Sequence, residues 1–414
     1  MGQTLSEPVI TKHTTKESSD KLFYGASAMQ GWRLSILFIY PSYAYNTVYL
    51  ARQLDLLDTF LRELVLSKLI GFLLRNETAM EDAHTTLLKL ADTDSSFFGV
   101  YDGHGGSKVA EYTGNQMHNK VRNSPFFDKK DYKEALRDAF MSLDKEINND
   151  NAFAFDPSGC TAVTALVTPD KRIFVANAGD SRSVISVDGK SKPLSYDHKP
   201  TNQLESQRII NAGGFVEYGR VNGNLALSRA IGDFEFKKNN QLPAEEQVVT
   251  CNPDIIEHQM SDADEFFVLA CDGIWDCMSN QQVVDFVRSK IVEETPIDKI
   301  CESMMDHCLS PNSEMTSVGC DNMSVVIVGI LNGKTEKEWY DWIASRAGAE
   351  ARKNFLQNDQ KNVTEKTEKT EKAEKTAEKA VKADEKDPAQ SSQAPSTKKA
   401  TARDIESDIK GNDK

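Results

Sequence analysis

Short apolar runs recur between about residue 97 and residue 330, and Gly, Asp or charged residues bound most of them. Runs of this length that are rich in β-branched and aromatic residues are typical of buried strands. They predict strands at residues 97–101, 161–167, 172–178, 266–271 and 323–330. A further pair of runs, 183–187 and 192–194, flanks Asp188-Gly189, a dipeptide that favours the tight turn of a β-hairpin.

Apolar residues at intervals of three and four mark another set of segments, because this spacing places them on one face of a helix. The spacing predicts helices at residues 132–147, 283–291 and 297–308, and a helix through 208–210 that ends at Gly213-Gly214. Strands and helices follow one another without a regular βαβ alternation. The pattern therefore predicts an α+β domain rather than a doubly wound parallel sheet.

The periodicity is lost in residues 336–414, where Thr-Glu-Lys repeats fill 364–372. Trp339, Trp342 and Ile343 predict one last helix that packs on the domain. The rest cannot bury enough apolar surface to offset the entropy of ordering, so we expect a charged, low-complexity, disordered tail. Such a tail is either a solvated spacer or a segment that docks a partner or is phosphorylated.

Composition and charge exclude some classes of partner and some cellular compartments. The chain has 414 residues, 39% of them hydrophobic, and a formal net charge of −14. Nucleic acid is not expected as a partner, because its phosphates require a basic face. The seven cysteines show no paired framework, and no apolar signal run opens the sequence. We therefore expect reduced thiols and a cytoplasmic or nuclear protein.

Acidic residues stand where the predicted strands begin or end. Asp102, Asp180 and Asp272 each follow a strand closely, and Asp321 directly precedes one. Each could simply be a turn residue. If the strands are neighbours, however, the four carboxylates converge, and converging carboxylates must bind protons or hold a cation. The set therefore predicts a metal site.

The ligand types indicate which metal this site would hold. Carboxylates, backbone carbonyls and water favour hard cations such as Mg²⁺ or Mn²⁺. Cys271 and Cys277 lack zinc-like spacing and are interpreted as core residues. His104 lies in the Gly-rich stretch Gly103-His104-Gly105-Gly106, so it is a candidate general acid beside the metal, although a lone His is more often structural.

Seven segments, in order along the chain, resemble the signature motifs of type 2C metal-dependent serine/threonine protein phosphatases. The similarity extends from about Lys21 to Asn332. It implies a four-layer αββα sandwich, in which two packed antiparallel sheets are flanked by helices. The implied catalytic domain is 21–335, interrupted by an atypical insertion at 36–79, and residues 336–414 form the terminal helix and tail. The matching segments are 98–106, 159–162, 177–182, 197–200, 220–233, 271–276 and 319–324.

The resemblance also implies a centre with two Mg²⁺ or Mn²⁺ ions. Asp102 would bridge both ions. Asp272 and Asp321 would hold one of them, and Glu81 and the Gly103 carbonyl would hold the other. A water between the ions, made acidic by them, would supply hydroxide for direct attack on phosphorus.

Further residues take supporting roles by the same resemblance. Asp180 and Asp276, with Asp272, would bind a weaker third ion. Asp82 would act in the shell behind the ligands, Arg33 would bind the substrate phosphate, and His104 would protonate the leaving oxygen. The implied substrates are phosphoserine and phosphothreonine in proteins. Two rivals stay open: a pseudophosphatase that binds phosphoproteins without turnover, and a phosphoesterase acting on small molecules.

The resemblance breaks between Arg33 and Glu81. Residues 36–79, 44 in all, separate segments that join without a gap when they are removed. Three interpretations remain: a gene-model artefact such as a retained intron, a true loop insertion with its own helix, or a splice form with damaged activity.

The N-terminus Met1-Gly2-Gln3-Thr4-Leu5-Ser6 fits the pattern for N-myristoylation at Gly2. A single acyl chain gives only weak and reversible membrane binding. We expect at most weak membrane association through such a lipid, and a monomer.

Overall fold

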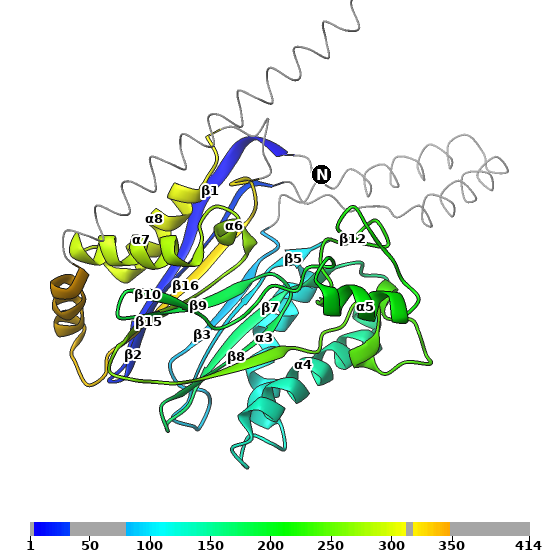
Figure 1. The fold of residues 1–414 in the computed structure, drawn as a ribbon, viewed down its shortest axis with the longest axis horizontal. Helices are drawn as coiled ribbons and strands as arrows, with labels where there is room; N and C mark the ends of the chain where they lie inside the picture. The colour runs from blue at the N-terminus through cyan, green and yellow to red at the C-terminus, as the bar shows by residue number, and fades with distance from the viewer. Residues whose placement is uncertain (1–3, 34–79, 312–317, 348–414) are drawn as a thin grey trace, which may run out of the picture. The chain divides into compact units, whose positions relative to one another are not determined.

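The computed structural model describes residues 4–33, 80–311 and 318–347, and two antiparallel sheets form their framework (Figure 1). The larger sheet has six strands in the order β1-β2-β16-β15-β9-β10. Its strands are β1 (Thr4–Ser18), β2 (Leu22–Arg33), β9 (Arg182–Val187), β10 (Lys190–Pro193), β15 (Asp264–Ala270) and β16 (Met323–Ile330).

The second sheet has five strands in the order β14-β8-β7-β4-β3. Its strands are β3 (Ala83–Leu87), β4 (Ser96–Tyr101), β7 (Ala162–Val167), β8 (Arg172–Ala178) and β14 (Asp254–Gln259). Two smaller sheets accompany it, β13-β6-β5 and β11-β12. Their strands are β5 (Gly103–His104), β6 (Gly159–Cys160), β11 (Val216–Glu217), β12 (Arg220–Val221) and β13 (Ile231–Gly232).

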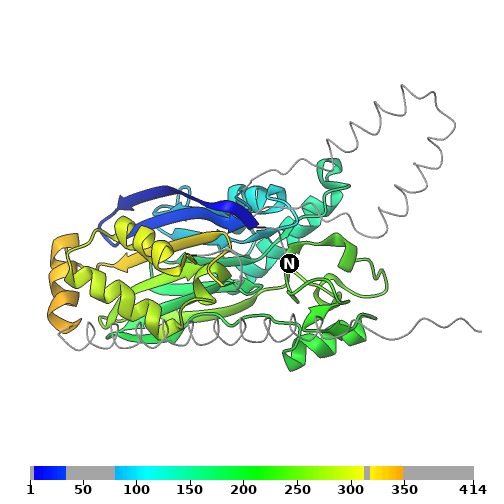
Figure 2. The same ribbon diagram turned by 90° about the horizontal axis from the view of Figure 1, so that it is seen from above.

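Helices cover the outer faces of both large sheets (Figures 1 and 2). The helices are α3 (Lys108–Asn123), α4 (Tyr132–Asn149), α5 (Gln203–Asn211), α6 (Asp272–Trp275), α7 (Asn280–Val292) and α8 (Ile297–Cys308), with short 3₁₀ turns at Asn151–Phe153, Phe234–Phe236 and Ala244–Glu246. One apolar cluster joins α6, α7 and α8 to the six-stranded sheet. Another joins α3 and α4 to the five-stranded sheet, and a third lies between the two sheets. The expected four-layer αββα sandwich is confirmed.

The period of two in β15 shows how the sequence produces these layers. Phe266, Val268 and Ala270 belong to the cluster under the helices. Phe267 and Leu269, which alternate with them, belong to the cluster between the sheets. Because successive side chains of a strand point to opposite faces, a continuous apolar run supplies two cores at once.

The strands and helices expected from the apolar pattern are confirmed, with small shifts at their ends. Asp188 and Gly189 both have positive φ, at 50° and 75°, as the expected tight hairpin turn requires. Among the elements of five or more residues, the pattern missed β1, β2, β3, β14 and α3, and it also missed the short elements β5, β6, β11, β12, β13 and α6. In β2, the buried stretch Gly25–Ala28 consists of small residues that lack the β-branched signature of a strand.

Strand β1 pairs with β2 along its length and forms one edge of the larger sheet. Its other contacts are with α8, through Lys12 to Asp306, Thr14 to Glu302 and Lys16 to Asp298.

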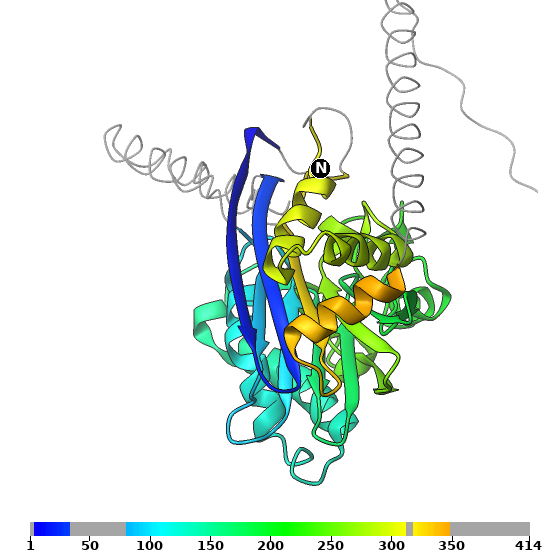
Figure 3. The ribbon, with the colours of Figure 1, turned by 90° about the vertical axis from the view of Figure 1, so that its left-hand side faces the viewer.

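The expected last helix is present at residues 336–347 (Figures 2 and 3). Trp339 and Ile343 are fully buried in the cluster that contains α7 and α8, and the Trp339 indole N–H donates to the Glu265 carbonyl at 2.9 Å. The insertion at 36–79 and the tail beyond residue 347 lie outside the described residues, so their predicted character stays a prediction. Among the described residues no helix is long and apolar enough to cross a membrane.

Candidate metal centre

The acidic residues predicted at strand ends come together at one end of the two sheets. Asp102 follows β4, Asp180 follows β8 after one Gly, and Asp272 opens α6 directly behind β15. One carboxylate oxygen from each of these three residues lies within 4.8 Å of the others. Asp321, two residues before β16, is close enough to act electrostatically on Asp102. The expected convergence is therefore observed.

Charge repulsion in this cluster is severe. Burial raises the pKa of Asp102 well above its usual range, and the like charges of Asp272, Asp82, Asp321 and Asp180 raise it further. A buried carboxyl among other carboxylates is stable only when a proton or a cation offsets the charge. The all-oxygen donor set and its spacing fit a hard divalent cation.

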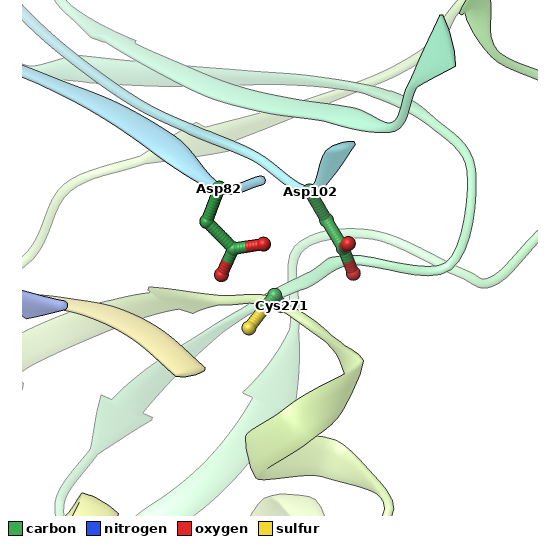
Figure 4. A group of neighbouring side chains, drawn as sticks. All are labelled: Asp82, Asp102 and Cys271. Atoms are coloured by element: carbon green, nitrogen blue, oxygen red, sulfur yellow. The ribbon is translucent and has the colours of Figure 1, made fainter. Parts of the chain in front are cut away.

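Asp82, Asp102 and Cys271 form a second group, in which one oxygen of each carboxylate and the Cys271 sulfur lie within 4.8 Å of one another (Figure 4). Burial raises the pKa of the Cys271 thiol, and the neighbouring carboxylates raise it further. The thiol donates to the Asn322 carbonyl at 3.4 Å and accepts from the Ser324 backbone N–H at 3.1 Å. Cys271 belongs to the apolar cluster between the two sheets, so it is a core residue, as expected.

Glu81 and Gly103 approach each other closely beside Asp102. A side chain at Gly103 would collide with the Glu81 carbonyl, so only glycine allows the two backbones to approach this closely. One carboxylate oxygen of Glu81 accepts the Gly106 backbone N–H at 2.8 Å. The Gly-rich loop after β4 thereby fixes the carboxylate that is expected to bind the second ion.

Asp180 already has a cationic neighbour. Its carboxylate forms an ion pair with the Lys199 ammonium, whose side chain is 40% exposed. Asp276 lies at the exposed rim beside them. Partial burial of its carboxyl raises the pKa of Asp276, as do the charges of Asp180 and Asp321, whereas Lys199 lowers it.

His104 is held by an aspartate that was assigned no role from the sequence. Its Nε2 lies 2.7 Å from the Asp233 carboxylate, which is 3% exposed. Asp233 directly follows β13, and His104 lies in β5, on the other side of β6. The expected general acid and its partner are therefore positioned by the small three-stranded sheet.

The two segments that flank the insertion meet at Asn322. Its side-chain amide donates to the Gln30 carbonyl at 2.8 Å, and its side-chain oxygen accepts the Glu81 backbone N–H at 2.9 Å. Gly31, with φ of +70°, lies against the Asp321 carbonyl. Arg33 ends β2 two residues later, so its backbone leaves the sheet beside the acidic cluster, while its side chain lies outside the described residues.

The arrangement of carboxylates, a Gly-rich loop and a paired histidine agrees with the comparison to protein families. The profile described as "Protein phosphatase 2C" matches residues 73–317. The chain belongs to the protein phosphatase 2C family. It is therefore a metal-dependent protein serine/threonine phosphatase, as the sequence motifs predicted.

Fungal members of the protein phosphatase 2C family are similar over most of the chain. "Protein phosphatase 2C homolog 2" of Hypocrea jecorina is 49% identical over 355 residues, which cover 84% of this chain and 71% of that protein. The protein of the same description from Schizosaccharomyces pombe is 45% identical, with 84% of each chain covered. A phosphatase structure from Toxoplasma gondii, 24% identical, covers 79% of this chain and 97% of its own with a TM-score of 0.58, and it supports the fold alone.

The sequence motifs contained three contributors whose roles were not predicted: Asp233, Asn322 and Lys199. Each stands within a segment that matches the phosphatase 2C motifs. Their roles arise from contacts across at least 19 positions of sequence, as between Lys199 and Asp180. A pattern of neighbouring residues carries no signal for contacts of that kind.

Proposed function

We propose that Asp102 is shared by two Mg²⁺ or Mn²⁺ ions, that Asp272 and Asp321 complete one site, and that Glu81 and the Gly103 carbonyl complete the other. The single observation that carries this proposal is the approach of the Asp102, Asp180 and Asp272 carboxylates to within 4.8 Å. The contact between Gly103 and Glu81 supports the second site.

When bound, the ions would supply an acidic water as the nucleophile and would neutralise charge on the phosphoryl oxygens. The chain's own residues supply the rest. The Arg33 guanidinium, whose planar fork matches a phosphate, binds and orients the substrate. His104 gives a proton to the seryl or threonyl oxygen as it leaves, because the free alkoxide would be a strong base. Asp82 lies behind the metal-binding side chains and orients them.

A weaker third ion would lie among Asp180, Asp276 and Asp272. The Lys199 ammonium already neutralises part of this charge, since it pairs with Asp180. A cation entering there must displace or share that contact. Its binding would therefore be weaker than binding at the Asp102 sites.

The substrates we propose are proteins that carry phosphoserine or phosphothreonine. We also propose a monomer that works in the cytoplasm, the nucleus or both, with weak membrane association if Gly2 is myristoylated. Gly2 lies outside the described residues, and its support is the sequence pattern alone.

Phosphate release from a phosphoserine peptide, compared with release from a small alkyl phosphate, tests this function. We expect turnover of the peptide with Mn²⁺ or Mg²⁺ and none after a chelator removes the metal. Peptide binding without turnover would support the pseudophosphatase alternative. Faster turnover of the small ester would support the small-molecule alternative, and full activity in metal-free buffer would refute the metal centre.

A further inference from the structure

The three-stranded sheet β13-β6-β5 places a histidine and an aspartate on either side of one glycine. His104 of β5 is paired with Gly159 of β6, and Gly159 is paired with Gly232 of β13, directly before Asp233. A side chain at Gly159 would collide with the Asp233 carboxylate and would lie 2.7 Å from His104 Nε2. The strand register and the missing side chain therefore create the space in which the two residues pair.

Asp233 has a left-handed backbone conformation, and its side chain makes no capping hydrogen bond to the turn that follows it. Its φ and ψ are 51° and 41°, in the left-handed region that a non-Gly residue rarely adopts. It stands at the N-cap of the turn Phe234–Phe236, where an aspartate ordinarily accepts a backbone N–H of that turn. Here no such bond forms, and the carboxylate is directed to His104 instead.

A second buried pair fixes the backbone from which Asp233 projects. Asp144 of α4 accepts the Gly232 backbone N–H at 2.8 Å and the Lys237 ammonium at 2.7 Å. The same ammonium donates to the Ala230 carbonyl at 2.8 Å. Gly232, directly before Asp233, and Lys237, four residues after it, are thus both held by Asp144 of α4.

We propose that Asp233 is a positioning residue for phosphate ester hydrolysis: its carboxylate holds the His104 ring by Nε2, so the hydrogen that reaches the leaving oxygen is the one on Nδ1. The proposal rests on the proposed role of His104. Nothing in it requires Asp233 to touch the substrate. Carboxylates that orient a working imidazole in this way are a general device of enzymes.

The proton and electron balance is simple. The phosphorus–oxygen bond to serine breaks, and its electron pair goes to the seryl oxygen, while the attacking water forms the new bond to phosphorus and gives up a proton to solvent. The hydrogen on His104 Nδ1 moves to the seryl oxygen. The ring keeps its hydrogen on Nε2, facing Asp233, and regains the other from solvent.

A comparison of leaving groups isolates this step. A phosphoserine peptide releases a strongly basic alkoxide, whereas 4-nitrophenyl phosphate releases a stable phenolate that needs no proton. We expect Asp233→Asn to lower kcat for the peptide by about 10–100-fold and to change kcat for the nitrophenyl ester by less than about 3-fold. An equal loss on both substrates, or no loss on either, would overturn the proposal.

His104→Ala distinguishes failure of this inference from failure of the proposed function. If His104→Ala lowers both substrates equally, the proposed role of His104 is wrong. If it acts on the peptide alone and Asp233→Asn does not, only the role of Asp233 is wrong. We expect the double variant to be no slower than His104→Ala alone, since the two residues act as a unit.

Asp262→Asn, in the exposed turn before β15, is the matched control, because it makes the same chemical change away from the pair. It should change neither the melting temperature nor the turnover of either substrate. If Asp233→Asn does not fold, ¹⁵N spectra of histidine in the unaltered full chain still test the proposal, because they show which ring nitrogen of His104 carries a hydrogen. They should show His104 with a hydrogen on Nε2, and a ring protonated on Nδ1 alone would contradict the proposal.

Discussion

Two halves of the candidate centre are built in different ways. Asp102, Asp180, Asp272 and Asp321 stand beside strand ends, so the register of the two sheets fixes their places. Arg33 and Glu81 belong to the junction between β2 and β3, which the insertion at 36–79 interrupts. The packing of the core fixes the position of residues at strand ends. The relative position of Arg33 and Glu81 depends on whether the chain returns to the same place after residues 36–79.

Asn322 is the point at which the two halves are joined. It lies between Asp321 and β16, and its side chain bonds to Gln30 before the insertion and to Glu81 after it. One amide therefore connects the strand-borne half to both sides of the junction. The comparison leads to a clear expectation: changes to strand-borne ligands remove activity, and changes at the junction modulate it.

The largest expected loss of activity comes from substitutions of the carboxylates at strand ends. Asp102→Asn and Asp272→Asn each remove charge from the ion site without a change in side-chain size, so each should lower kcat/KM for a phosphopeptide at least about 100-fold. Asp262→Asn, in the exposed turn before β15, is the matched control and should leave kcat/KM unchanged. A ligand variant that retains a tenth of the activity would contradict the assignment.

Removal of the insertion tests the junction. Deleting Ile36–Ala79 joins Ser35 to Met80 and should raise kcat/KM by about 10-fold or more, because Arg33 regains its position. The melting temperature should also rise, since closing a loop of this length costs roughly 3 kcal/mol.

Arg33→Ala should then reduce activity far more in the deletion variant than in the full chain, a coupling that a double-mutant cycle measures. Equal losses in both backgrounds would mean that the insertion leaves the site assembled. A deletion variant that does not fold would instead identify residues 36–79 as a structural element.

Asn322→Ala should uncouple the halves without removing a ligand. It leaves the buried Glu81 N–H without this acceptor and should lower the free energy of unfolding by about 1–3 kcal/mol. Because Glu81 is displaced, the apparent affinity for Mn²⁺ should fall while kcat at saturating Mn²⁺ changes less. A loss of kcat with unchanged Mn²⁺ affinity would show that Asn322 serves the substrate side instead.

A smaller effect concerns pH. Because the pKa of Asp102 lies above its usual value near 3.8, the metal-free folded protein keeps a proton on this carboxyl at higher pH than a free aspartate would. A proton on Asp102 competes with a metal ion for the same oxygens. In the metal-free protein, this group's contribution to stability falls as pH rises through that window, because the folded state binds the proton more tightly than the unfolded chain does.

Saturating Mn²⁺ should therefore raise the melting temperature by more at about pH 7.5 than at about pH 5. Thermal melts with and without Mn²⁺ at both pH values measure this difference. In Asp102→Asn the dependence on pH should shrink. A rise in melting temperature that is independent of pH in the unaltered protein would exclude competition at Asp102.

The smallest effect is expected from the tail. Deleting residues 348–414 should change peptide turnover by less than about 2-fold, because the Thr-Glu-Lys repeats have no apolar surface to contribute to the core. A deletion that starts at residue 336 is the control. It also removes the buried side chains of Trp339 and Ile343, and it should cost several kcal/mol of stability.

The sequence predicted the parts that local patterns encode. The runs at 172–178, 297–308 and 323–330 match β8, α8 and β16 at both ends, because each is a continuous apolar run or has a strong helical spacing. It did not predict β2, since small residues give no strand signal, although that strand carries Gly31 and Arg33 to the site. The pairing of His104 with Asp233 depends on three strands meeting, which no single segment encodes.

The contact between β1 and α8 has a geometric consequence. Every second residue of the strand, Lys12, Thr14 and Lys16, meets every fourth residue of the helix, Asp306, Glu302 and Asp298. Two residues of strand advance about 6.7 Å and four residues of helix about 6 Å, so the two repeats stay in step over three contacts. Added salt screens the two ion pairs, Lys12–Asp306 and Lys16–Asp298, but not the apolar layers. At high salt the edge strand should therefore detach before the two sheets separate.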